Sequence, residues 1–391
     1  MSLPWPGSIA ARTIEAGTEC CSLERTGVEL DTYRLLGRSG LRVSPLALGT
    51  MTFGDAWGWG ADADEARRIL DAYLDRGGNF IDTANRYTDG ASESLLGDFA
   101  QGRRERLVLA TKYSMARDPG DPNSGGNHRK SMVASVEESL RRLATDYLDL
   151  LYLHAWDFST PVEEILRAMD DLVRAGKVLY VAISDTPAWQ VARMQAIADL
   201  RGWSPLIALQ VEYSLVERTT ERDLIPMATE MGLGVVPWSP LASGVLTGKY
   251  DVTDLEHTVS SDPSGSRRNV AAANGSLTER ALRIVGVVKK VAAELGHTPS
   301  QVAIAWTLRN PAVTAPIVGA RTEAQLTENL GALEVELPDA LLAELADVSA
   351  VELGFPHDFL NREMPRQVLF GGVRIEGVTD LSPDVHAAAA R

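Results

Sequence analysis

The chain has almost no cysteine. Of its 391 residues only Cys20 and Cys21 are cysteines, and they are adjacent. Adjacent cysteines cannot link distant segments, and no cysteine or histidine spacing suggests a metal site. The fold is therefore expected to form without disulfides and without a bound metal, as in a reducing cytoplasm.

Long apolar runs and an excess of basic residues are also missing. No stretch reaches the ~18–20 apolar residues that a membrane-spanning helix needs, and residues 1–12 lack the apolar core of a signal peptide. The formal net charge is −15. Such an acidic chain disfavours nucleic acids and anionic membranes as partners and favours a soluble protein. An anionic ligand would need cations placed locally around it.

The sequence does contain a regular alternation of short apolar runs with stretches of helical periodicity. One such helix is expected over 63–76, ending before Gly77 and Gly78. Eight buried strands alternating with helices predict a closed (β/α)8 TIM barrel, with an open doubly wound sheet as the alternative. The eight expected strands cover residues 45–50, 79–82, 107–112, 149–154, 178–184, 207–213, 234–240 and 312–319.

The glycine fingerprint of a Rossmann dinucleotide fold is absent. After the first expected strand, the segment from Gly49 to Gly54 lacks the G-x-G-x-x-G spacing. A nicotinamide-binding protein of Rossmann type is therefore disfavoured, which supports the barrel.

The two ends of the chain differ from this middle part. Residues 1–31 show no helix or strand period and are expected to form a flexible N-terminal extension. Residues 33–44 have the pattern of a hairpin that turns at 38–40. From about residue 352 the pattern breaks into Gly, Pro and aromatic residues, which predicts a C-terminal tail over the barrel mouth. Residues 32–391 are thus expected to form one barrel with its tail.

Ionisable side chains stand at the ends of three successive strands. Asp82, Lys112 and His154 end the second, third and fourth expected strands, and Tyr87 follows Asp82 by five positions. In a barrel the C-terminal strand ends converge on one mouth. Each residue alone could equally be an ion pair or a satisfied buried polar group. Their common position predicts a reactive cluster.

These four residue types suit proton transfer to a carbonyl. A free phenol, with a pKa near ~10, is a poor acid or base at neutral pH. The ammonium of Lys112 is expected to lower the pKa of Tyr87, and Asp82 to keep Lys112 charged and in place. The phenol could then protonate a carbonyl oxygen as hydride reaches carbon, while His154 orients that oxygen.

In order and local context, the four residues resemble the catalytic tetrad of the aldo-keto reductases. The resemblance implies a barrel whose floor is closed by the 33–44 hairpin, with NADPH bound in extended form across the mouth. It covers residues from about 33 to 351 and is carried by LGTM at 48–51, FIDTA at 80–84, ATK at 110–112, WSPL at 238–241 and EN at 328–329.

The resemblance also implies cofactor contacts at the strand ends. Trp238 would stack on the nicotinamide, unless it is a plain core aromatic, and Ser184, Asp185 and Gln210 would meet the carboxamide. Most of the family has Asn where Asp185 stands, and a carboxylate can only accept a hydrogen bond from the carboxamide. The other expected cofactor residues are Gly49, Thr50, Met51, Asp82, Ser239, Pro240, Leu241, Ala242, Gly244, Lys249, Arg268, Gly319, Glu328 and Asn329.

A helix start after the eighth strand offers a site for a phosphate. Arg321 precedes Thr322 and Gln325, which have the spacing of a capping box. A helix N-terminus beside a guanidinium is a suitable seat for a 2′-phosphate, so NADPH is expected rather than NADH. Gln325 could either contact the cofactor or cap the helix. Arg267 and Arg268 lie in a Gly/Ser-rich stretch that could fold across the cofactor or remain solvated.

Two further segments, YLHAWD at 152–157 and SDTPAW at 184–189, resemble the aryl-alcohol-dehydrogenase-like branch. The expected function is reversible NADPH-dependent reduction of aromatic or bulky aldehydes and ketones, by a monomer or a homo-oligomer. Trp57, Trp59, Trp156 and the 114–127 loop could shape such a substrate pocket or simply pack at the surface. An NADPH-binding regulatory subunit with slow turnover and a barrel isomerase or lyase without a redox cofactor are the alternatives.

Overall fold

The computed structural model describes residues 29–256 and 266–373. The expected N-terminal extension up to residue 28, including Cys20 and Cys21, lies outside the described residues. Within them, Leu30 is already buried against the core with 4% of its surface exposed. The packed part of the chain therefore includes Leu30.

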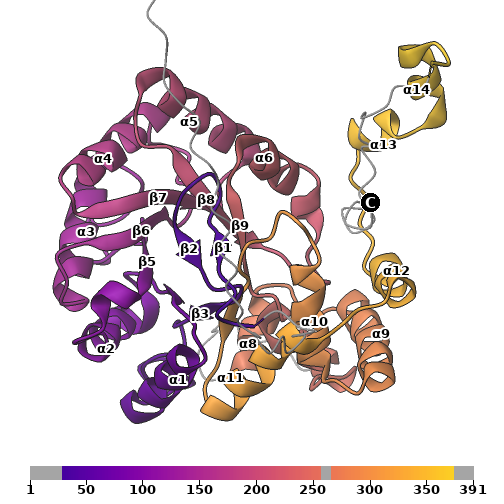
Figure 1. Cartoon of the computed structure of the whole chain (residues 1–391), viewed down its shortest axis with the longest axis horizontal. Helices are drawn as coiled ribbons and strands as arrows, with labels where there is room; N and C mark the ends of the chain where they lie inside the picture. Colours follow the sequence, from indigo (N-terminus) through magenta and orange to yellow (C-terminus); the bar gives the residue numbers. More distant parts are fainter. Residues whose placement is uncertain (1–28, 257–265, 374–391) are drawn as a thin grey trace, which may run out of the picture.

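Eight parallel strands form a nearly closed barrel (Figure 1). Each strand from β3 to β8 pairs with the next one in sequence, and β10 pairs with β3. A bridge between Val235 and Val313 links the remaining gap between β9 and the segment before β10. The TIM barrel expected from the sequence is confirmed. Its strands are β3 Ala47–Gly49, β4 Phe80–Asp82, β5 Val108–Tyr113, β6 Leu148–Leu153, β7 Val178–Ser184, β8 Leu206–Glu212, β9 Gly234–Trp238 and β10 Ile317–Gly319.

Helices surround the strands on the outside (Figure 1). Most of them pack against the outer side of the barrel and form the larger apolar core with it, while α12 packs on α9. Among the helices of the described residues, none is long and apolar enough to cross a membrane. Their bounds are α1 Ala63–Asp75, α2 Ala91–Phe99, α3 Arg129–Arg142, α4 Val162–Arg174, α5 Ala188–Arg201, α6 Leu224–Met231, α7 Thr253–Glu256, α8 Arg267–Ala273, α9 Glu279–Leu295, α10 Pro299–Leu308, α11 Glu323–Leu330 and α12 Asp339–Val348.

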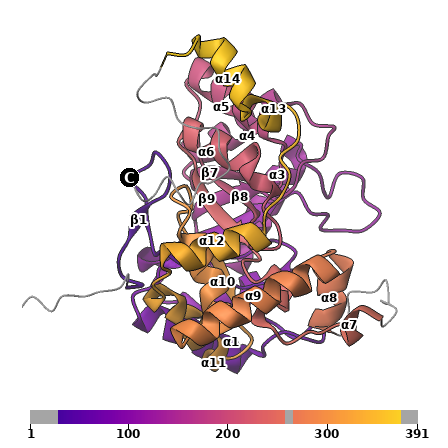
Figure 2. The ribbon, with the colours of Figure 1, turned by 90° about the vertical axis from the view of Figure 1, so that its right-hand side faces the viewer.

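A short hairpin closes one end of the barrel. Strands β1 (Arg34–Leu35) and β2 (Arg42–Val43) pair antiparallel, and they lie across the centre of the ring of strands (Figure 1). Leu36 and Val43 of this hairpin are fully buried and pack with the side chains that fill the barrel interior, such as Phe80. Figure 2 shows the hairpin on the side of the barrel opposite α7 and α8. The mouth is therefore at the other end, where the strands point.

The eighth strand is shorter than expected. The sequence indicated a strand over 312–319, but regular pairing with β3 is limited to Ile317–Gly319. Pro316 directly precedes it and has no N–H to donate to a sheet ladder. The preceding residues instead bond to β9, where Val235 N–H donates to Ala312 O and Thr314 N–H donates to Val235 O. The segment 312–319 thus pairs first with β9 and then with β3.

Two expectations for the last third of the chain need correction. The spacing of Ser276 and Glu279 in the sequence predicts a helix start at Ser276, but Thr278 caps this helix, α9, instead. Arg268, expected in a loop, lies in α8, and residues 257–265 are outside the described part. By contrast, the helix start that the spacing of Thr298, Pro299 and Gln301 predicts is confirmed at α10, where Thr298 and Gln301 form a capping box.

The C-terminal tail does not cover the mouth as far as residue 373. Two short helices, α13 (His357–Leu360) and α14 (Glu363–Phe370), continue away from the barrel beyond α12 (Figure 1). The tail contacts the β8–α6 connection, where Arg222 donates to Phe355 O at 3.2 Å. No described residue beyond Asn329 lines the pocket at the mouth. Of the tail aromatics, Phe355 is 78% and Phe359 40% exposed, while Phe370 is half-buried.

Leu36 of the hairpin is part of the apolar cluster that fills the barrel floor. Leu36→Ala should lower the free energy of unfolding by about 2–5 kcal/mol, because it leaves a cavity in a closed core. Leu35→Ala is the matched control: Leu35 is 58% exposed, and a surface truncation should change stability by less than about 0.5 kcal/mol. Urea unfolding followed by circular dichroism measures both, and equal midpoints would show that Leu36 does not close the barrel.

Candidate active site

Lys112 is the centre of a buried polar cluster at the mouth. Its Nζ lies 2.6 Å from Asp82 Oδ2 and donates to Thr83 O at 2.9 Å and to Tyr87 Oη at 3.0 Å. Only 1% of Lys112 and 2% of Asp82 are exposed. The ring of His154 approaches that of Tyr87 edge to face, with centroids 6.0 Å apart. The four residues expected to form a tetrad do come together.

The strand ends account for this convergence. Asp82 is the last residue of β4, and Lys112 is the penultimate residue of the neighbouring β5. His154 directly follows β6, and its N–H donates to Tyr113 O at 3.0 Å. Parallel pairing of successive strands therefore brings the side chains to one end of the barrel.

Tyr87 reaches this cluster from a strained loop. It begins a short 3-10 turn in which Thr88 and Asp89 have positive φ values of 46° and 56°. Thr88 Oγ1 anchors the turn by donating to Phe53 O at 2.6 Å and accepting from Ser92 N–H at 3.1 Å. Left-handed backbone at non-glycine residues has a cost that the surrounding structure must offset, and it is common at functional sites.

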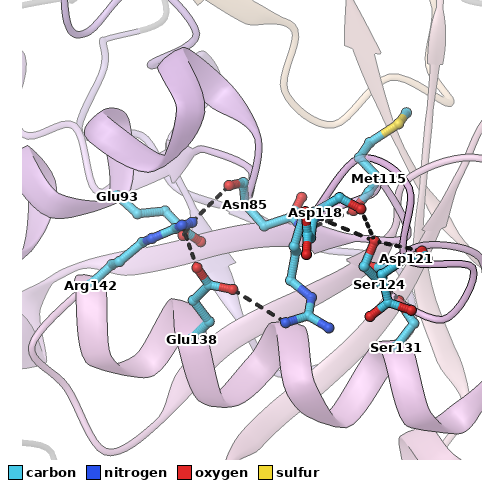
Figure 3. A network of polar contacts seen from close by, with 10 residues as sticks. Asn85, Glu93, Met115, Asp118, Asp121, Ser124, Ser131, Glu138 and Arg142 are labelled. Atoms are coloured by element: carbon cyan, nitrogen blue, oxygen red, sulfur yellow. Dashed lines mark hydrogen bonds and ion pairs between the residues drawn. The ribbon is translucent and has the colours of Figure 1, made fainter.

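A second set of contacts, from α3, holds the loop that carries Tyr87 in place (Figure 3). The guanidinium of Arg142 on α3 donates to Asn85 O at 2.8 Å and forms ion pairs with Glu93 and Glu138. Asn85 in turn donates through its N–H to Lys112 O at 3.1 Å and through Nδ2 to Met115 O at 3.3 Å. Asn85 thus connects the loop that carries Tyr87 to the strand that carries Lys112.

The protonation states differ in part from expectation. Lys112 does lower the pKa of Tyr87, but burial is the larger influence, and the net result is a pKa above the ordinary phenol value. Burial alone would lower the pKa of Lys112, yet the attraction of Asp82 and Tyr87 outweighs it and raises the pKa. At neutral pH the cluster therefore holds an ammonium beside a protonated phenol, which can donate a proton.

His154 is neutral in this setting. Burial and, to a lesser degree, the charge of Lys112 lower its pKa to about 3. Among the described residues, its Nδ1 has no hydrogen-bond partner. A neutral imidazole carries one N–H, so it can orient an oxygen by donating a hydrogen bond while it is itself uncharged.

A pocket of about 680 Å³ opens onto the cluster. This volume is within the ~300–1,000 Å³ of small-molecule and cofactor sites. One end is lined by Asp82, Tyr87 and His154, and the other by residues after β9 and β10, including the cations Lys249 and Arg321. The pocket therefore joins a proton-donating end to a positively charged end.

The polar groups at the first end include one without a protein partner. Ser184 Oγ is buried, lines the pocket and has no hydrogen-bond partner among the described residues. Gln210 lines the pocket too, while its Nε2 donates to Asp82 Oδ1 at 2.9 Å. Asp185 Oδ1 accepts from Trp238 Nε1 at 3.0 Å. A ligand amide would satisfy the free Ser184 hydroxyl, so this end fits a nicotinamide carboxamide.

The second end surrounds the N-terminus of α11. Gln325 lines the pocket, and its N–H donates to Thr322 Oγ1 at 3.2 Å. Its Oε1 accepts from Arg321 N–H at 3.0 Å and not from Thr322 N–H, so the capping box is only half formed, and the contact with a cofactor stays a prediction. Asn329 Nδ2 donates to Gly319 O at 3.2 Å and holds the glycine turn against the helix. Glu65 of α1 already accepts from the first helical N–H, that of Glu323, at 2.8 Å. The side chain of Arg321, not the helix terminus alone, would therefore have to attract an anion here.

Most residues expected to contact a cofactor line this pocket, but three do not. Thr50 is buried behind it and donates through Oγ1 to Asp82 O at 2.9 Å. Ala242 is buried in the loop after β9. Arg268 pairs with Asp254 at 3.1 Å and is not part of the lining. The expected residues that do line it are Gly49, Met51, Asp82, Ser184, Asp185, Gln210, Trp238, Ser239, Pro240, Leu241, Gly244, Lys249, Gly319, Arg321, Gln325, Glu328 and Asn329.

Several lining residues were not singled out from the sequence. Asn274, at the end of α8, donates to Ser243 Oγ at 3.3 Å, and both line the pocket. Ser243 lies between two expected residues, so its neighbours could have indicated it. Asn274 had no sequence signal, because α8 was expected to be a loop. The remaining additions are Thr52, Thr247, Val270, Ser300, Ile317, Val318 and Ala320.

The aromatic residues considered for a substrate pocket lie outside this lining. The rings of Trp57 and Trp59 are 5.7 Å apart, and Trp156 packs against the apolar core. The 114–127 loop is tied to the segment after β6, because Asn127 Nδ2 donates to Ala155 O at 2.8 Å. Their role in substrate binding stays a prediction.

Known proteins are similar to this sequence over most of its length. The Aldo/keto reductase family matches residues 45–350. The uncharacterized oxidoreductase YrpG of Bacillus subtilis is 41% identical over 330 residues, which cover 81% of this chain and 95% of the relative. Norsolorinic acid reductase stcV of Emericella nidulans is 40% identical over 339 residues, 84% of each protein.

A third relative has a cofactor in its name. Aryl-alcohol dehydrogenase [NADP(+)] of Phanerodontia chrysosporium is 37% identical over 334 residues, covering 81% of this chain and 86% of the relative. Together with the barrel and its cluster of Asp82, Tyr87, Lys112 and His154, these matches place the protein: the chain belongs to the aldo/keto reductase family and is an oxidoreductase of that family.

Proposed function

We propose that the protein reduces aldehydes and ketones to alcohols with NADPH, reversibly, and that Tyr87 is the general acid and base. The observation that carries the proposal is the 3.0 Å contact between Lys112 Nζ and Tyr87 Oη, at the end of the pocket that Tyr87 and His154 line. This contact joins a proton donor to a fixed positive charge beside a space large enough for a dinucleotide.

The residues divide the work of the reaction. When bound, NADPH supplies the hydride. Tyr87 Oη gives its proton to the carbonyl oxygen, and the nearby ammonium of Lys112 stabilises the phenolate that forms. His154 donates a hydrogen bond to the same oxygen and fixes its direction. In the alcohol-to-carbonyl direction the phenolate takes the proton back.

Ser184 and Gln210 would hold the nicotinamide carboxamide, and Trp238 would pack on the ring. The support is their position in the lining next to the tetrad, together with the unpartnered Ser184 hydroxyl. The residues after β9, including Lys249, would contact the pyrophosphate. The backbone there is left-handed at Ser239, Ala242 and Ser243, with φ between 48° and 55°, and such strain commonly marks ligand sites.

The substrate class is inferred from the relatives. One relative is named for aryl alcohols and another for norsolorinic acid. We therefore propose aromatic or bulky carbonyl compounds as substrates.

A regulatory subunit that binds NADPH with slow turnover is the second candidate. Both candidate functions use the same pocket, so only the rate of NADPH turnover distinguishes them. A complete tetrad with Lys112 and Asp82 both buried favours turnover, because a pure sensor has no need for a proton donor at this place.

Replacing the phenol tests the central role. Tyr87→Phe should lower kcat for NADPH-dependent reduction of a benzaldehyde by about 10²–10⁴-fold, the usual contribution of a general acid. The dissociation constant of NADPH, from tryptophan fluorescence quenching, should change less than about threefold. Tyr33→Phe, which removes the hydroxyl that donates to Gly77 O on the outside, is the matched control. Turnover near that of the control in the Tyr87 variant would refute the role of the phenol.

Arg321 tests the choice of cofactor. Arg321→Ala should weaken NADPH binding by about 10–100-fold, because a charged hydrogen bond to a phosphate contributes about 1.5–3 kcal/mol. NADH, which has no 2′-phosphate, should lose little affinity. Arg309→Ala, at an exposed arginine outside the lining, controls for net charge. Equal losses for the two nucleotides in the Arg321 variant would mean that Arg321 does not recognise the 2′-phosphate.

A further inference from the structure

The carboxylate of Asp185 is placed where a neutral amide is usual in the family. Asp185 directly follows β7 and lines the tetrad end of the pocket, together with Tyr87, His154 and Trp238. A hydride can pass only between atoms in contact. The reacting carbon of a bound dinucleotide must therefore lie at this end, beside Tyr87, with its phosphates toward Lys249 and Arg321.

The position of Asp185 is held on three sides. Its N–H donates to Gln210 O at 3.3 Å, and its O accepts from Trp156 N–H at 3.2 Å. Its side chain accepts from Trp238 Nε1 at 3.0 Å. The backbone has a positive φ of 31°, which Asp and Asn tolerate better than other side chains. The carboxylate is thus part of the pocket wall and not a mobile surface group.

Burial raises the pKa of Asp185, and the hydrogen bond from Trp238 and the nearby charge of Lys112 oppose that rise. Asp82 is paired with Lys112 at 2.6 Å, whereas Asp185 forms no ion pair with another residue in 29–256 or 266–373. Its side chain accepts a hydrogen bond from the uncharged indole of Trp238. The charge nevertheless acts on the reacting groups, because Asp185 adds to the rise in the pKa of Tyr87.

The two redox states of the cofactor differ in charge at the ring that reacts. The oxidised nicotinamide is a cation and the reduced ring is neutral. A carboxylate in the same wall attracts the cation, and the attraction grows when a bound cofactor displaces water. An asparagine of equal shape would keep the hydrogen bond from Trp238 but not the attraction.

We propose that Asp185 determines which redox state of the cofactor the site prefers: its carboxylate strengthens binding of the oxidised dinucleotide relative to the reduced one. The inference rests on the proposed function. It adds that the same charge stabilises the positive ring that develops as hydride leaves, so Asp185 promotes hydride donation and slows release of the oxidised product.

The test is equilibrium binding without turnover. NADP⁺ and NADPH are titrated separately into wild type and Asp185→Asn at pH 8.5, with tryptophan fluorescence as the signal. In the variant, NADP⁺ should bind about tenfold more weakly and NADPH within about twofold of wild type. The ratio of the NADP⁺ to the NADPH dissociation constant should therefore rise about five- to twentyfold. Circular dichroism checks that the variant is folded.

Glu212→Gln is the matched control. Glu212 ends β8 and interacts electrostatically with Asp185, but it does not line the pocket. Burial, Glu217 and Asp185 raise the pKa of Glu212 to about 7, so at pH 8.5 this variant also removes a negative charge. In this variant the ratio of the NADP⁺ to the NADPH dissociation constant should stay within about twofold of wild type.

The outcomes separate the inference from the function. If neither nucleotide changes the fluorescence of the wild type, the proposed cofactor is wrong. If both bind and Asp185→Asn leaves their ratio unchanged, the cofactor proposal stands and the role of Asp185 is refuted. A shift of equal size in Glu212→Gln would also overturn it, because the effect would then come from the general acidity of the mouth.

Discussion

The ammonium of Lys112 lies almost wholly out of water, with 1% of the residue exposed. A lone buried charge is strongly unfavourable, and removing one partner of a buried pair commonly costs about 3–5 kcal/mol. Here Asp82, Thr83 O and Tyr87 Oη surround the ammonium at 2.6, 2.9 and 3.0 Å. The phenol is thus one of the three groups that keep Lys112 satisfied, which ties the position of the proton donor to the stability of the pair.

The barrel makes this pair possible. Asp82 and Lys112 leave adjacent parallel strands, so the sheet pairing itself sets their separation. Gln210, from β8 on the far side, reaches Asp82 across the mouth. The floor is closed by the hairpin at the opposite end, where no chemistry takes place. Strained turns that carry site residues, such as the one at Thr88, lie at the mouth.

The sequence predicted the parts that follow from local periodicity and from strand order. Strand ends at Asp82, Lys112 and His154 could be recognised because apolar runs stop there, and the barrel follows from eight such runs. What it could not supply depends on contacts between distant segments. Whether Pro316 would shorten the last strand, and whether the tail would reach the mouth, depended on neighbours such as Val235 and Arg222.

The pKa shifts, too, could be predicted from the sequence only in part. The pairing of Tyr87 with Lys112 was foreseeable, and so was the sign of the effect of Lys112 on the pKa of the phenol. The net direction was not, because burial outweighs the ammonium. Likewise, Thr50 matched a motif for cofactor contact, but its hydroxyl faces the backbone of Asp82. A motif indicates that a residue is near the site and leaves open which way its side chain points.

The pH dependence of kcat in both directions tests most directly whether Tyr87 is the proton donor. A phenol whose pKa is raised above ~10 stays protonated at lower pH, and a histidine with a pKa of about 3 does not titrate near neutrality. Reduction should therefore keep a constant kcat from pH 6 to about pH 9, while alcohol oxidation, which needs the phenolate, should rise over the same range. A reduction rate that falls with a midpoint near pH 7 would contradict the account, because a group other than Tyr87 would then supply the proton.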